Sequence, residues 1–159
     1  FVADCAAQAS WLVKSLDQRA KTILKVSSEI VRQQDAFLAF GVEFLRPLNL
    51  KTVADAIGMH ESTVSRVTSG KYCQTPRGVF ELKFFFSSGL DTRGGEEISA
   101  KSAKAIISKL IDGEDRKAPL SDQKIAEVLK AQGLDIARRT VAKYREQLNI
   151  PNARFRRRH

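Results

Sequence analysis

Four cationic side chains lie close together in one short stretch near the end of the chain, residues 137–146. They are Arg138, Arg139, Lys143 and Arg145. A guanidinium group can donate two hydrogen bonds at once to N7 and O6 of guanine, and Arg and Lys also pair with phosphate. The stretch therefore predicts a basic recognition helix that reads DNA in the major groove.

The positive charge of the chain is concentrated around this stretch. The sequence has 159 residues and a net charge of +9, of which +7 lies in residues 137–159 and +2 in all the rest. Local charge of this kind indicates a phosphate partner, either a nucleic acid or an anionic membrane surface. The rest of the basic region is a cationic tail: Arg154, Arg156, Arg157 and Arg158. Phe155 is too little apolar surface for a membrane anchor, so we expect the tail to contact the DNA backbone.

A second candidate for DNA contact is the stretch 59–67. Apolar anchors at Val64 and Val67 leave the polar residues facing outward or sideways. These are His60, Glu61, Ser62, Thr63, Ser65 and Arg66. Ser, Thr and Arg suit base edges and phosphates. Glu61 either accepts a hydrogen bond from a cytosine amino group or interacts with the positive end of its own helix.

Helix-start signals predict how these side chains are positioned. Asn49 is a favourable N-cap, Leu48 and Val53 can form a hydrophobic staple, and a helix Leu50–Ile57 should stop at Gly58. A second helix, about Glu61–Thr68, should end near Gly70. This spacing predicts a helix-turn-helix.

The same pattern returns 72 residues later. Leu120, Ser121, Ile125, Ala126 and Leu129 stand where Leu48, Asn49, Val53, Ala54 and Ile57 stood. In this second copy we expect a longer turn, Ala131–Ile136, with Gly133 ending the first helix and Asp135 as N-cap of the second. The anchors on the second helix should be Ile136, Val141 and Leu148. Tyr144 either packs inside or contacts a phosphate.

The remaining segments complete an all-α prediction of a long N-terminal helix and two helix-turn-helix modules joined by a linker. Apolar residues spaced every seven positions from Leu16 to Phe37 predict one helix from about Asp4 to Phe40, either a bundle helix or a spacer. The aromatic residues at 80–86 indicate core packing rather than base stacking. The Ser/Gly-rich Ser87–Gly95 predicts the linker, followed by a helix Ile98–Ile111. The predicted domains are residues 1–46, 47–90 (motif 49–68) and 91–159 (basic box 137–146).

Other functions have weak support in the sequence. His60 with Ser62 or Glu61 could act as base and nucleophile, but we expect no second buried histidine, and the sequence shows no nucleophile elbow and no phosphate-binding glycine loop, so we expect no enzyme. Two distant cysteines and two histidines give no zinc pattern, and we expect no cofactor or metal. No signal peptide or membrane span is evident, so we expect a soluble, cytoplasmic protein. The start at Phe1 suggests a C-terminal fragment of a longer protein.

Three stretches resemble the bacterial sigma-54 family of RNA polymerase promoter-specificity subunits. The run Ala-Arg-Arg-Thr-Val-Ala-Lys-Tyr-Arg-Glu at 137–146 is similar to the signature box of that family. The stretch 59–67 resembles its helix-turn-helix, and residues 71–85 resemble the segment that follows it. The resemblance covers essentially the whole chain.

The resemblance implies a specific role. In this family the box helix reads the GG of the −24 promoter element, so Arg138, Arg139, Thr140, Lys143, Tyr144 and Arg145 would contact that element. The helix-turn-helix would lie near the −12 element, and the long helix would connect to the part that binds the RNA polymerase core enzyme. Transcription would require an AAA+ activator ATPase acting through regions mostly absent from this chain. The competing hypothesis is a general nucleic-acid binder with little base preference.

Overall fold

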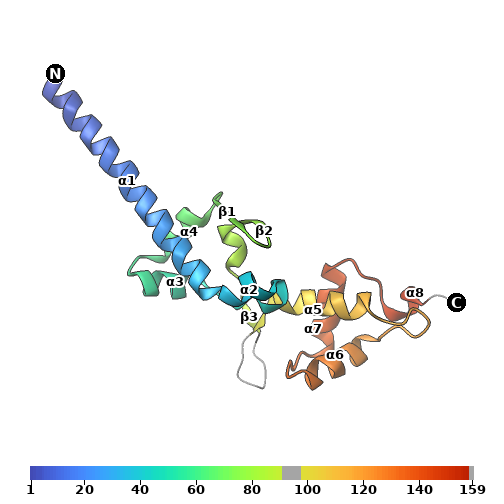
Figure 1. Cartoon of the computed structure of the whole chain (residues 1–159). Coiled ribbons are helices and arrows are strands. Elements are labelled where there is room, and N and C mark those ends of the chain that lie inside the picture. The colour runs from blue at the N-terminus through green and yellow to red at the C-terminus, as the bar shows by residue number, and fades with distance from the viewer. Residues whose placement is uncertain (91–97, 158–159) are drawn as a thin grey trace. The chain divides into compact units, whose positions relative to one another are not determined.

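The computed structural model describes residues 1–90 and 98–157, and these residues are mostly helical (Figure 1). They form two compact units, each described separately below. Unit 1 comprises residues 1–38 and 48–86, and unit 2 comprises residues 39–47 and 87–159. The domain boundaries expected from the sequence, after residues 46 and 90, differ from this division and stay a prediction.

The N-terminal helix is shorter than predicted. Helix α1 spans Val2–Gln33 and α2 spans Asp35–Phe40, with a break at Gln34 that neither Pro nor Gly causes. Gln34 is 1% exposed, and its side-chain amide lies 3.5 Å from the carbonyl oxygen of Phe85. Asp35 then accepts a hydrogen bond from the backbone N–H of Ala36 at 2.7 Å. Polar contacts of a buried side chain and its neighbour therefore accompany the break in the helix.

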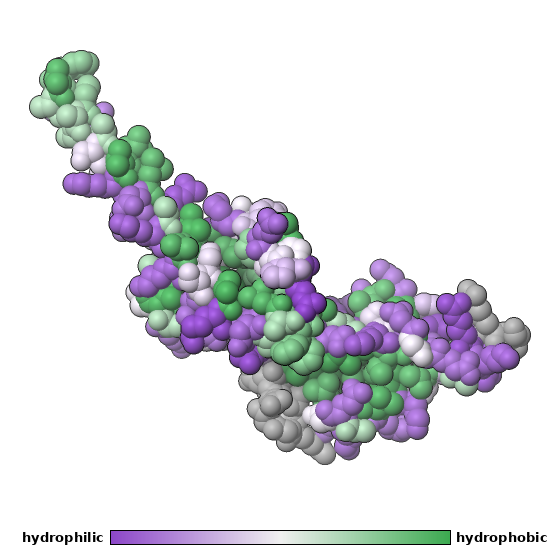
Figure 2. Space-filling view, viewed as in Figure 1, coloured by the Kyte–Doolittle hydropathy of each residue, from purple (hydrophilic) through white to green (hydrophobic). Residues whose placement is uncertain are grey.

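The apolar stripe of α1 is buried only toward its C-terminal end. Val26 and Ile30 are fully buried in unit 1, whereas Leu16 and Leu24 are 57% and 67% exposed. Figure 2 shows apolar surface along the N-terminal half of this helix. The seven-residue spacing thus predicted the helix but not how much of it is covered by other elements of the unit.

Two short helices of unit 1 match their predicted bounds. Helix α3 spans Leu50–Ile57, and Gly58 ends it in the left-handed conformation with φ 65°. The side chain of Asn49 caps α3 by accepting from the backbone N–H of Thr52 at 2.7 Å. Helix α4 spans Glu61–Thr68 and packs against α3 and α1, burying Val64.

A β-hairpin follows α4, which the all-α prediction missed. Strands β1 (Tyr72–Thr75) and β2 (Gly78–Glu81) pair antiparallel, with Thr75 opposite Gly78 across the two-residue loop. The hydroxyl of Thr75 donates to the carbonyl oxygen of Gly78 at 2.8 Å and accepts from the N–H of Arg77, which closes the turn.

The aromatic cluster after the hairpin forms core, as predicted. The 3-10 helix η2 (Leu82–Phe85) buries Leu82 and Phe85. The ring of Phe37 lies edge-on to the rings of Phe80 and Phe85, with centroids 5.3 Å apart in each case. Such edge-to-face packing stabilises aromatic pairs beyond the area they bury.

Unit 2 is built around three helices. It contains the 3-10 helix η1 (Val42–Phe44), α5 (Ala100–Asp112), α6 (Asp122–Ala131), α7 (Arg138–Gln147) and α8 (Ala153–Arg156). Ile107, Ile125, Leu129 and Val141 are fully buried and form the centre of its core. Ser121 caps α6 by accepting from the N–H of Lys124 at 3.2 Å, so the predicted N-caps of α3 and α6, Asn49 and Ser121, are confirmed.

A second strand pair joins part of the predicted linker to the first residues of the helix predicted over Ile98–Ile111, which begins at Ala100. Strand β3 (Gly89–Leu90) pairs antiparallel with β4 (Ile98–Ser99), and Ser99 caps α5 through the N–H of Ser102. The rest of the predicted linker, residues 91–95, lies outside the described residues. Within the described part of the chain, no helix is both long and apolar enough to cross a membrane.

Candidate nucleic-acid interface

Helix α7 begins without the N-cap that the sequence predicted. Ala137, not Asp135, holds the capping position, and its methyl side chain makes no capping hydrogen bond. Asp135 precedes the helix by three residues, because the chain first runs through the buried anchor Ile136. The first turn of α7 is therefore basic rather than acidic, with Arg138 and Arg139 next to the free backbone amides of the helix start.

The two faces of α7 differ in charge and burial. Val141 is fully buried and Ile136 nearly so, as expected for anchors, whereas Leu148 is half-buried. Arg138, Arg139 and Lys143 are exposed and make no hydrogen bond or ion pair with any described residue. Thr140 is half-buried. The outer face of α7 thus presents three cations free to meet an anionic partner.

Arg145 does not belong to this outer face. Its side chain is 7% exposed, and its Nε and Nη2 donate to the two carboxylate oxygens of Asp122 at 2.8 and 3.2 Å. Nη1 donates to the carbonyl oxygen of Ile150 at 2.7 Å. The hydrogen bonds to Asp122 raise the pKa of the Arg145 guanidinium above its ordinary value. The expectation that Arg145 projects toward DNA is corrected: this side chain holds the end of α7 to the start of α6.

Tyr144 packs inside, which settles one alternative left open by the sequence. The residue is 8% exposed and joins the core of unit 2. The ammonium group of Lys104 on α5 lies 5.4 Å from the centre of its ring, a cation–π contact. Burial raises the pKa of the Tyr144 phenol.

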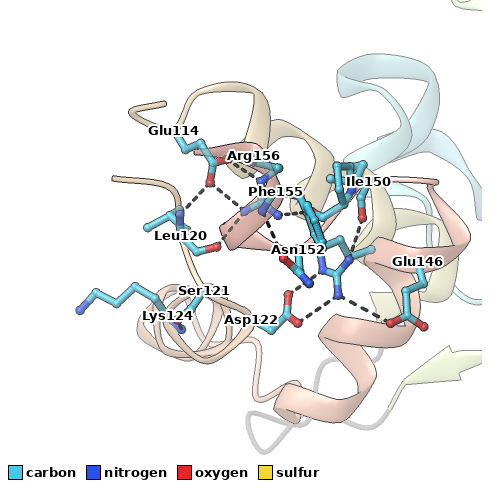
Figure 3. Close-up of polar contacts among 12 residues, drawn as sticks. Glu114, Leu120, Ser121, Asp122, Lys124, Glu146, Ile150, Asn152, Phe155 and Arg156 are labelled. Carbon is cyan, nitrogen blue, oxygen red and sulfur yellow. Dashed lines mark hydrogen bonds and ion pairs between the residues drawn. The ribbon is translucent and has the colours of Figure 1, made fainter. Parts of the chain in front are cut away.

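The cationic tail is divided between internal and external roles. Arg156 is 9% exposed, and its Nε and Nη2 donate to the carboxylate of Glu114 at 2.6 and 3.0 Å (Figure 3). The same guanidinium donates to the carbonyl oxygens of Pro151 and Leu120 at 2.6 and 2.8 Å. Arg156 is therefore a structural contact, which corrects the expectation of a phosphate contact.

Two further tail residues lie on the surface. Arg154 is exposed and makes no hydrogen bond or ion pair with a described residue. Arg157 is also exposed and donates to the carbonyl oxygen of Lys117 at 3.2 Å. Arg158 lies outside the described residues.

Helix α4 offers a smaller and less basic surface. His60 holds the N-cap position, and its Nδ1 accepts from the backbone N–H of Ser62 at 3.2 Å. Glu61, Ser62 and Arg66 are exposed, while Thr63 and Ser65 are half-buried. Because Glu61 lies in the first turn of the helix, its carboxylate also interacts favourably with the helix dipole.

Two acids that the sequence pattern did not single out hold the inward-facing arginines. Asp122 and Glu114 neutralise the two buried guanidinium groups. One sequence signal pointed to this arrangement: Arg145 follows the anchor Val141 by four residues, so it falls on the inward face of the helix. Nothing comparable marked Arg156, whose partner is 42 residues away.

Comparisons with known proteins place the chain in a family. A family model described as "Sigma-54, DNA binding domain" matches residues 1–158. The chain is 71% identical to the RNA polymerase sigma-54 factor of Caulobacter vibrioides and 64% identical to that of Azorhizobium caulinodans, each over 99% of its length. It spans about a third of those relatives, 32% and 31% respectively.

A solved structure is also similar. It is the crystal structure of Aquifex aeolicus sigmaN bound to promoter DNA, with 39% sequence identity and a TM-score of 0.66. The similarity covers 98% of the present chain and 47% of that chain.

Proposed function

The chain belongs to the sigma-54 DNA-binding domain family, and on that premise we propose that it is the promoter-binding part of an alternative bacterial sigma factor. It is not an enzyme: its task is to recognise duplex DNA. The observation that carries the proposal is the outer face of α7, where Arg138, Arg139 and Lys143 are exposed and free of internal partners. The similar Aquifex aeolicus sigmaN was solved bound to promoter DNA, which supports the same role.

In this proposal α6 and α7 form a helix-turn-helix whose second helix reads the GG of the −24 element. Arg138 and Arg139 lie at the start of α7, the part of a recognition helix that reaches base edges. Thr140 and Lys143 follow on the same helix. Arg154 and Arg157 would contact phosphates and set affinity without carrying sequence information.

Helices α3 and α4 would form the second helix-turn-helix, near the −12 element. The contacts would come from His60, Glu61, Ser62, Thr63, Ser65 and Arg66. The surface of α4 carries one exposed arginine against several on α7 and the tail. We therefore expect most of the electrostatic affinity to come from unit 2.

The partners of the whole sigma factor follow from the family. They would be the RNA polymerase core enzyme and an AAA+ activator ATPase that remodels the complex. The protein would act in the bacterial cytoplasm, at the nucleoid. This chain alone should bind promoter DNA without supporting activated transcription.

Competition between two duplexes tests the proposal. One carries both promoter elements, and the other differs only in the GG of the upstream element. Promoter recognition predicts that the first duplex binds at least about tenfold more tightly at physiological salt, because each wrong base pair costs roughly 1–3 kcal/mol. Equal affinity for both duplexes, with a strong dependence on salt, would instead favour the general nucleic-acid binder.

A further inference from the structure

We propose that Arg145 is a positioning residue whose ion pair with Asp122 sets the base preference of α7 without touching DNA. The inference rests on the proposed function, because it concerns how the −24 element is read. It goes further by assigning an internal role to a cation of the basic box and by naming Asp122 as its counterpart.

Each nitrogen of the Arg145 guanidinium already donates a hydrogen bond within unit 2. Two of these bonds go to Asp122 and one to Ile150, at 2.7 to 3.2 Å. The exposed carboxylate of Glu146 adds a longer ion pair at 3.6 Å. To reach a base, Arg145 would have to break these bonds and leave Asp122 with no cationic partner, which is costly for a side chain 18% exposed.

The same contact closes a loop at the end of α7. The backbone N–H of Ile150 donates to the carbonyl oxygen of Arg145 at 3.1 Å, while the Arg145 side chain donates to the carbonyl oxygen of Ile150. The chain turns between them through Asn149, which has a φ of 57°, in the left-handed region. Asp122 is the first residue of α6, so the ion pair joins the end of one helix to the beginning of the other.

Asp122 also lies beside the surface proposed to contact DNA. It lines a shallow groove together with Ala137, Arg138, Arg139 and Ala142. An unneutralised carboxylate here would repel phosphate and would attract the arginines needed for the bases. Arg145 neutralises it from the buried side, which leaves the arginines of the first turn free. The pair thus fixes both the orientation of α7 and the electrostatic surroundings of Arg138 and Arg139.

Three variants of the present chain separate positioning from direct contact: Arg145→Gln, Asp122→Asn and the double change Arg145→Met/Asp122→Leu. Arg154→Gln is the matched control, because Arg154 is an exposed arginine of the same unit. Two quantities are measured for each variant. The first is the ratio of affinities for the promoter duplex and the GG-altered duplex, and the second is the slope of log K against log salt concentration.

Positioning predicts a lower ratio for both single variants. The slope should stay unchanged for Asp122→Asn, whereas Arg145→Gln leaves the carboxylate unneutralised and is judged by its ratio alone. Arg145→Gln and Asp122→Asn should each lower the ratio by roughly tenfold, the scale of one good base contact. The apolar double variant removes both charges together and should recover most of the ratio. Arg154→Gln should shallow the slope by about 0.9 and leave the ratio unchanged. If circular dichroism shows that Arg145→Gln is unfolded, the ratios and slopes of Asp122→Asn and the double variant still distinguish positioning from direct contact.

Direct contact predicts a different pattern. The double variant would then keep the low ratio of Arg145→Gln, and Asp122→Asn would free Arg145 and tighten binding with a steeper slope. Either result would overturn the inference. A wild-type ratio near one would instead refute the proposed function itself, so the two failures are distinguishable.

Discussion

Replacing Arg156 by Met should destabilise unit 2, although it only removes one charge from a tail rich in arginine. Arg156 and Glu114 have side chains 9% and 5% exposed, and the guanidinium also donates to two backbone carbonyl oxygens. Truncation would leave the Glu114 carboxylate buried with one remaining partner, the backbone N–H of Leu120 at 2.8 Å.

The magnitude follows from the burial of the pair. Removing one partner of a buried ion pair costs about 3–5 kcal/mol, and the surface position of the tail favours the lower end, about 3 kcal/mol. With a urea dependence of roughly 1 kcal/mol per molar for a unit of this size, the unfolding midpoint should fall by roughly 3 M. Arg154→Met, on the exposed neighbour, should change stability by less than about 0.5 kcal/mol.

The pair also predicts a pH dependence. Burial alone would raise the pKa of Glu114, but the hydrogen bonds from Arg156 and Leu120 and the charge of Arg156 lower it below its ordinary value of 4.5. A carboxyl whose pKa is lowered by folding stabilises the folded state above its unfolded pKa, and this stabilisation is lost as the pH falls through the folded pKa. Wild-type protein should therefore lose stability below about pH 4.5.

Urea unfolding followed by circular dichroism, at pH 7 and at pH 3, checks these expectations. The double variant Arg156→Met/Glu114→Leu is the informative control, because it should be more stable than Arg156→Met and should lose less stability on acidification than wild type. If Arg156→Met proves as stable as Arg154→Met, the pair is not structural and the reasoning fails.

Three further predictions concern DNA binding and helix starts. Arg139→Ala should weaken promoter binding by roughly 1–3 kcal/mol with relaxed preference at one base pair, measured by competition among duplexes; uniform loss across all duplexes would refute base contact. Arg157→Ala should weaken binding to all duplexes alike and make the dependence of log affinity on log salt concentration shallower by about 0.9, measured by titration at several salt concentrations. An altered base preference would contradict a phosphate role. Asn49→Ala and Ser121→Ala should each lower the free energy of unfolding by about 1 kcal/mol, since each removes a capping acceptor. Thermal unfolding of each variant checks this, and an unchanged stability would mean that the cap is dispensable.

Local signals were enough to predict much of the helical structure. The bounds of α3 and α4, the caps at Asn49 and Ser121 and the inward anchor Val141 depend on neighbours a few residues away. Such interactions leave a periodic pattern that a single sequence displays.

The features that were missed depend on partners distant in sequence. The break at Gln34 involves a contact 51 residues away, and Arg145 and Arg156 find their acids 23 and 42 residues away. A count of basic residues cannot distinguish a cation facing solvent from one buried against a carboxylate. The hairpin β1–β2 was missed for another reason: its four-residue strands are too short to show a clear alternation.

The pairing of Arg145 with Asp122 has a consequence for protein engineering. Grafting residues 137–146 onto another scaffold would transfer the three exposed cations together with a guanidinium that has lost its carboxylate and its backbone acceptor. The transplanted helix would bring an unsatisfied buried charge, and its host would lose stability. The smallest segment that can be transferred with these contacts intact therefore runs from the start of α6 to Ile150. It is a supersecondary unit and not the ten residues of the basic box alone.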